Sequence, residues 1–74
     1  MRIDELNPGD CISVKDFPVE YGIIIGTCQY EYDLTLYVEI QDTTGEKWTL
    51  YPHREVTKIS EARFLEEERK HVRI

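Results

Sequence analysis

The chain has 74 residues, of which 41% are hydrophobic and 32% charged, and its formal net charge is −6. This length suits one small domain with a single core, and it excludes a deep, enclosed active site. No apolar run approaches the roughly 18 residues of a membrane span, so no membrane segment is expected. The first five residues lack a secretory pattern and two cysteines are too few for a disulfide framework, which together predict a cytoplasmic protein.

The negative charge is unevenly distributed. Residues 1–59 contain 11 acidic and 5 basic side chains, a balance of 5 − 11 = −6, whereas residues 60–74 contain four of each. Nucleic-acid affinity comes largely from neutralised phosphates, so this balance disfavours nucleic acid as a partner. A basic protein partner is compatible with it.

Alternating apolar residues and the turns between them predict five short strands, at residues 11–15, 22–29, 34–41, 46–51 and 56–59. Three consecutive isoleucines, residues 23–25, predict burial on both faces of the second strand. Gly26 is the expected bend or bulge. Pro18 places residues 16–21 in a loop, and Pro52 ends the fourth strand.

The third and fourth strands form a hairpin whose register follows from the sequence. A three-residue loop, Thr43-Thr44-Gly45, pairs Ile40 with Trp48 and Val38 with Leu50. A four-residue loop would set Ile40 opposite Lys47, and a one-residue slip moves the apolar set to solvent, so the shorter loop is favoured. Asp42 then faces Glu46, and we expect solvent to screen their repulsion. Tyr37 and Tyr51 face outward together.

Residues 60–74 have a helical pattern. Ser60 is the expected N-cap of a helix from Glu61 to about His71, with Glu66–Lys70 as an i,i+4 ion pair. The residues expected on its contact stripe are Ala62, Leu65, Arg69 and Val72. A helix this short is marginal alone, so it must dock on the preceding domain or on a partner, and both alternatives stay open.

Four segments together resemble the SH3-like barrels, broadly the bacterial SH3, KOW and Tudor-like domains. They are Leu6-x-Pro8-Gly9-Asp10-x-Ile12-x-Val14, Gly22-x-Ile24, the Asp42-x-x-Gly45 turn and Tyr51-Pro52-x-x-x-Val56. The resemblance implies an all-β, five-stranded SH3-like barrel over residues 1–59, followed by a short C-terminal helix in residues 60–74. It implies little about function, because small barrels have many roles.

No catalytic or metal-binding motif stands out. Cys11 and Cys28 lack Cys-x-x-Cys spacing and are expected to behave as small hydrophobes. His53 has no evident orienting partner, and no carboxylate pair has the spacing of a calcium loop. We therefore expect no enzyme activity, no cofactor and no metal.

Tyrosines provide the strongest functional signal. They exceed what so small a core needs, and tyrosine is enriched at protein interfaces. The predicted binding face comprises Tyr21, Tyr30, Tyr32, Tyr37 and Tyr51, with Glu39 and Asp33 meeting a basic rim. The alternative without a binding role is that cross-strand tyrosine pairs only stabilise an exposed sheet.

The predicted function is a non-enzymatic protein-interaction module, either an adaptor or a small subunit of a larger assembly. The first alternative is KOW-like binding of nucleic acid or ribonucleoprotein. It would use the basic residues Lys15, Lys47, Arg54 and Lys58. The second is an acidic inhibitor or nucleic-acid mimic. The oligomeric state and the identity of the partner are left open by the sequence.

Overall fold

A computed structural model describes residues 3–29, 32 and 35–71 of the chain. Along the chain it contains one short 3₁₀ helix, five strands and one α-helix. Their bounds are η1 Ile3–Glu5, β1 Cys11–Val14, β2 Tyr21–Gln29, β3 Leu36–Asp42, β4 Lys47–Leu50, β5 Val56–Ile59 and α1 Glu61–His71. The prediction of five strands followed by a short C-terminal helix is confirmed.

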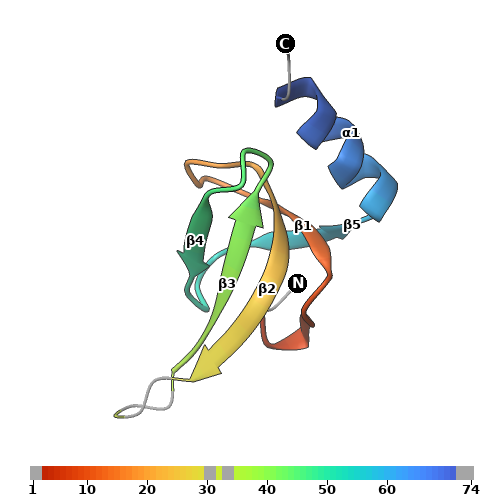
Figure 1. Cartoon of the computed structure of the whole chain (residues 1–74). Helices are drawn as coiled ribbons and strands as arrows, with labels where there is room; N and C mark the ends of the chain where they lie inside the picture. Colours follow the sequence, from red (N-terminus) through yellow and green to blue (C-terminus); the bar gives the residue numbers. More distant parts are fainter. Residues whose placement is uncertain (1–2, 30–31, 33–34, 72–74) are drawn as a thin grey trace.

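All five strands form one antiparallel sheet in the order β4-β3-β2-β1-β5 (Figure 1). β4 and β5 are its two edges. Within the described residues no ladder joins these edges, so the sheet is open.

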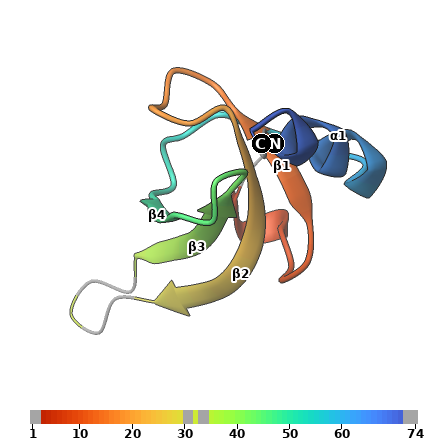
Figure 2. The ribbon, with the colours of Figure 1, turned by 45° about the horizontal axis from the view of Figure 1, so that its top comes forward.

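The long strand β2 gives the sheet its curvature, and Figure 2 shows it as an arc. Its pairing with β3 shifts between Ile24 and Gly26, which leaves Ile25 as the extra residue of a bulge. Ile24 is buried but Ile25 is 38% exposed. The bend at Gly26 is therefore confirmed, whereas burial of all three isoleucines was wrong. Alternation along the strand turns Ile23 and Ile25, the neighbours of buried Ile24, to the face opposite the core.

The β3–β4 hairpin has the predicted register. Val38 pairs with Leu50, Ile40 with Trp48, and the amide of Asp42 donates to the carbonyl of Glu46 at 2.9 Å. Gly45 has a φ of 90°, the left-handed conformation that this turn needs and that glycine adopts without steric cost.

One hydrophobic core unites the sheet with the N-terminal turn. Its buried side chains are Ile3, Leu6, Ile12, Val14, Ile24, Val38, Ile40, Leu50 and Val56. A methyl group added at Gly22 would lie 2.7 Å from Cδ1 of Ile40, so glycine allows the close packing of β2 on that core residue. Phe17, Val19 and Trp48 pack against the cluster at its margin.

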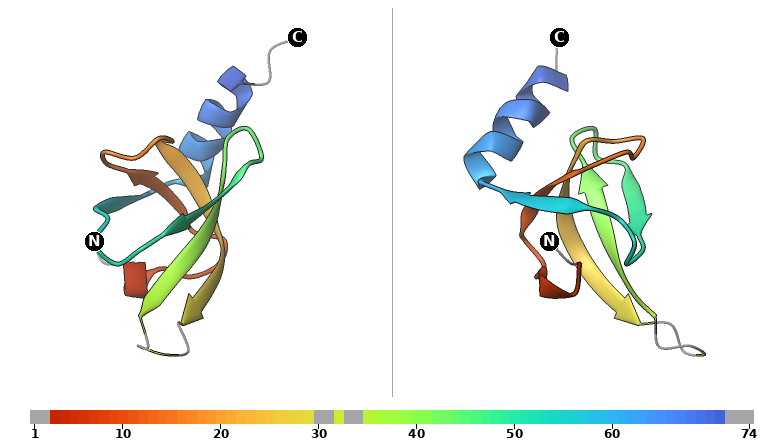
Figure 3. Two further views of the ribbon diagram at one scale, coloured as in Figure 1. Left: turned by 90° about the vertical axis from the view of Figure 1, so that its left-hand side faces the viewer. Right: turned by 180° about the vertical axis from the view of Figure 1, so that it is seen from behind.

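Helix α1 packs near β1 and β2 and projects beyond one end of the sheet (Figures 1 and 3). Ser60 caps it, since its Oγ accepts a hydrogen bond from the amide of Arg63 at 3.1 Å. The bounds were predicted correctly but the contact stripe was wrong. Phe64 is the buried residue, whereas Ala62 is exposed and Leu65 is 43% exposed. Val72 lies outside the described residues.

The predicted Glu66–Lys70 ion pair is also replaced. Lys70 Nζ lies 3.1 Å from Oε1 of Glu67, one residue further along, in an i,i+3 pair. This geometry brings Lys70 toward the side of the helix that faces β2.

Phe64→Ala should release α1 from the sheet. The substitution removes the one described side chain of α1 that is fully buried, and large-to-small changes of a buried phenylalanine cost about 3 kcal/mol or more. We expect amide hydrogen exchange in α1 to accelerate strongly while β2 and β3 stay protected. Leu65→Ala, one residue away but exposed, is the control and should change helix protection little. Equal effects of the two substitutions would contradict the assignment of Phe64 as the anchor.

Candidate functional site

The outer face of β3 and β4 carries the paired tyrosines. The rings of Tyr37 and Tyr51 have centroids 6.1 Å apart and are tilted by 40°. Tyr37 is half-buried and Tyr51 is 47% exposed. The hairpin register accounts for this pairing, because Tyr37 and Tyr51 are the next residues beyond the Val38–Leu50 pair, with Tyr51 directly after the end of β4.

Charged side chains share this face of the hairpin with the two rings. Glu39 is half-buried opposite Thr49, and exposed Lys47 lies opposite Gln41. A shallow depression here is lined by Glu39, Lys47, Trp48 and Thr49. We name Tyr37, Glu39, Lys47, Thr49 and Tyr51 the outer face. It presents aromatic surface beside a carboxylate, which suits contact with an apolar protein segment that carries a positive charge.

The other predicted binding residues are only partly assembled with this pair. Tyr32 is 90% exposed in the connection between β2 and β3, at the end of the sheet where β3 begins. Tyr30 and Asp33 lie outside the described residues. Tyr21 begins β2, whereas Cys28, near the end of that strand, pairs with Tyr37. Tyr21 and Cys28 are 28 − 21 = 7 residues apart along β2, so Tyr21 lies roughly 20 Å along the strand from the Tyr37–Tyr51 pair.

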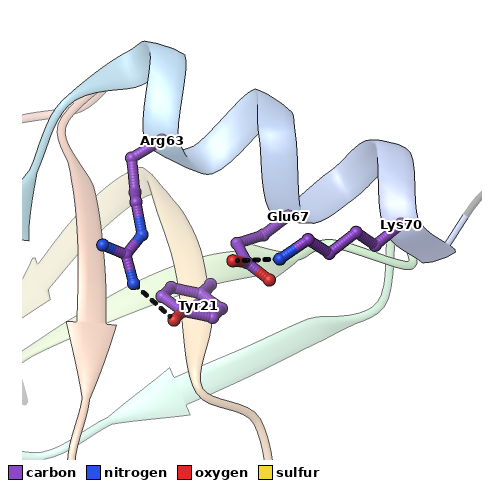
Figure 4. A network of polar contacts seen from close by, with 4 residues as sticks. All are labelled: Tyr21, Arg63, Glu67 and Lys70. Atoms are coloured by element: carbon purple, nitrogen blue, oxygen red, sulfur yellow. Dashed lines mark hydrogen bonds and ion pairs between the residues drawn. The ribbon is translucent and has the colours of Figure 1, made fainter.

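Tyr21 instead contacts the C-terminal helix. Its hydroxyl accepts a hydrogen bond from Nη2 of Arg63 at 3.0 Å, and the Arg63 guanidinium lies 5.6 Å from its ring centroid (Figure 4). The hydrogen bond with Tyr21 raises the pKa of Arg63 further above its ordinary value. Position in the chain alone does not reveal this contact, because it joins residues 42 apart in sequence.

Phe17 is likewise engaged within the fold. Its ring meets that of Trp48 edge to face at 5.6 Å, and the Arg54 guanidinium lies 5.1 Å from its centroid. Arg54 Nη1 also donates a hydrogen bond to the carbonyl of Asp16 at 3.0 Å, and Asp16 itself has a φ of 54°. These contacts tie the β1–β2 loop to β4 and to the turn that precedes β5.

The role of Asp42 as a buried hydrogen-bond acceptor was not predicted from the sequence. Asp42 is 4% exposed, so the expectation that solvent screens it was wrong. Its Oδ1 accepts hydrogen bonds from the amides of Thr44 and Glu46 and from the Thr44 hydroxyl, and its Oδ2 accepts one from Trp48 Nε1, all at 2.7–2.9 Å. Burial acts to raise the pKa of this carboxyl, but the four hydrogen bonds outweigh it, and the pKa lies below its ordinary value.

The basic residues of the nucleic-acid alternative are mostly occupied. Lys15 lies 3.7 Å from Glu55, and Lys58 lies 3.3 Å from Asp10. Arg54 is held by Asp16 and Phe17 as described above. These positive charges are thus already balanced or contacted within the chain, which leaves little concentrated positive surface for phosphates.

Neither cysteine forms a disulfide. Cys11 is buried in β1, where burial raises the pKa of its thiol, and Cys28 is half-buried in β2. Across the described ranges, histidine, cysteine and acidic side chains form no group of three that could hold a metal ion. Over the same ranges, no helix has the length and apolar character needed to cross a membrane.

Comparison of the chain with known protein families, with curated proteins and with solved structures gave no match in any of the three.

Asp42→Asn should destabilise the hairpin that displays the outer face. The amide nitrogen cannot accept the bonds that one carboxylate oxygen accepts, so the free energy of unfolding should fall by about 1–3 kcal/mol at neutral pH. Because the folded-state pKa of Asp42 is depressed, its stabilisation is complete above the unfolded-state value of about 4 and is lost as the pH falls through the folded value. The difference from wild type should therefore shrink in acid.

Urea unfolding measured between neutral pH and about pH 2 tests this expectation. Glu46→Gln is the matched control, since it removes one negative charge from the same turn at an exposed side chain. It should change stability by less than about 0.5 kcal/mol. A constant difference between wild type and Asp42→Asn over the whole pH range would contradict the role given to the Asp42 carboxylate.

Proposed function

We propose that this chain is a non-catalytic protein-interaction module, an adaptor or a small subunit of a larger assembly, that binds through its outer face. The observation that carries the proposal is the Tyr37–Tyr51 ring pair beside Glu39. Tyrosines at the centre of protein interfaces often contribute a large share of the binding energy. The pair lies on a rigid sheet, so little conformational entropy is lost when a partner binds.

The partner that this face fits is a protein segment with an apolar centre and nearby lysine or arginine. The net charge of −6 attracts such a segment and repels acidic ones. The same charge, together with the internal contacts of Lys15, Lys58 and Arg54, speaks against the nucleic-acid alternative.

We also propose that the curved sheet is that of an SH3-like barrel. Two observations support this. β1 lies between β2 and β5, so the last strand returns beside the first. The bulge in β2 bends the sheet so that residues of all five strands share one core.

Tyr37→Ala combined with Tyr51→Ala should reduce partner binding at least about tenfold, the usual loss when central aromatic contacts are truncated. The measurement is capture of stoichiometric partners by the tagged chain from lysate of its own host, with and without nuclease, at low and high salt. Leu65→Ala, an apolar change at similar exposure on α1, is the control and should bind as wild type does.

Three results would overturn the proposal. The first is unchanged capture by the double variant when its circular dichroism shows a retained fold. The second is loss of the captured material on nuclease treatment, which would favour nucleic acid. The third is capture of a basic DNA-binding protein that high salt abolishes and the double variant retains, which would favour an acidic mimic.

A further inference from the structure

A groove runs between α1 and the two connections next to it, the β1–β2 loop and the β3–β4 turn. It lies at the end of the sheet from which α1 projects, where β2 begins and β3 ends (Figures 1 and 3). We name it the helix groove. Its lining residues are Pro18, Val19, Glu20, Tyr21, Thr43 and Glu67.

The lining combines apolar and acidic groups. Pro18 and Val19 form an apolar wall, and Val19 packs against the main core. Glu20 and Glu67 contribute two carboxylates, and none of the described residues that line the groove is basic. A lining that combines apolar side chains with carboxylates matches the two parts of a lysine or arginine side chain, its aliphatic stem and its charged end.

The chain's own cations already make the contacts that such a ligand would make. Arg63 lies against the Tyr21 ring and donates to its hydroxyl, and Lys70 pairs with Glu67 (Figure 4). The Glu67 side chain is only 15% exposed, so its charge needs a partner, whereas the Lys70 side chain that supplies it is 62% exposed. Because Lys70 reaches Glu67 from an exposed position, an incoming cation can take its place and satisfy the same carboxylate.

We propose that the helix groove binds a lysine or arginine side chain from a basic segment of a partner protein, with Glu20 and Glu67 at its charged end and Pro18, Val19 and the Tyr21 ring along its stem. Lys70 competes with the incoming charge for Glu67. The groove is a second binding surface, separate from the outer face and roughly the length of β2 away from Tyr37. The acidic lining repels phosphates, so a nucleic acid is not the ligand.

The test titrates the full chain with a hexalysine and a hexaarginine peptide while amide chemical shifts are recorded. Shift changes should concentrate at the amides of residues 19–21, 43 and 67. Glu20→Gln should weaken binding by about two- to fivefold, the range expected for one exposed charge pair. Glu5→Gln removes the same charge from η1, at the far end of the sheet (Figure 3), and should weaken binding less.

A second pair of variants tests the competition. Lys70→Gln should tighten peptide binding more than Lys47→Gln, which removes an equal charge from β4 on the outer face. The Tyr37→Ala and Tyr51→Ala double variant should bind the peptides as wild type does, so failure of the groove and failure of the outer face are distinguishable. Diffuse shift changes, or equal effects of Glu20→Gln and Glu5→Gln, would overturn the proposal in favour of non-specific attraction to an acidic protein.

Discussion

The hydrogen-bonded carboxylate of Asp42 is the constraint on which the arrangement of the hairpin depends. It holds two amides, a hydroxyl and the Trp48 indole at one point, and so fixes both the turn and the placement of Trp48. The register that follows sends Val38, Ile40 and Leu50 into the core. The same alternation places Tyr37 and Glu39 on the opposite side. Core and outer face are therefore two results of one register, which the Asp42 contacts stabilise at the turn.

Sequence patterns predicted the elements that leave a local signal, such as a regular spacing of apolar residues or a capping residue. Alternation along residues 34–41 and the three-residue loop after Asp42 predicted the pairing, and Ser60 marked the start of the helix. Both signals depend on near neighbours in the sequence. The burial of Phe64 was not predicted, because several helix faces have similar apolar content and only the sheet selects one. Asp42 was misread because an aspartate beside a turn is usually solvated, and only the three-dimensional turn shows its four donors.

The tyrosines show a similar division between local and long-range information. Pairing of Tyr37 with Tyr51 follows from the hairpin and could be predicted. The separation of Tyr21 from that pair could not, because it depends on the length of β2 and on a helix more than 40 residues later in the chain. What was predicted as one tyrosine face thus divides into the outer face at one end of the sheet and the Tyr21–Arg63 contact at the other.

Among the described strands, β4 and β5 each pair with one neighbour only, so each leaves one edge without a ladder. Each edge strand has only four residues, and each contains one lysine, Lys47 or Lys58. Short, charged edges offer a poor template for adding a foreign strand, and the net charge of −6 adds repulsion between copies of the chain. The short, lysine-bearing edge strands are thus of the kind that disfavours edge-to-edge pairing of sheets.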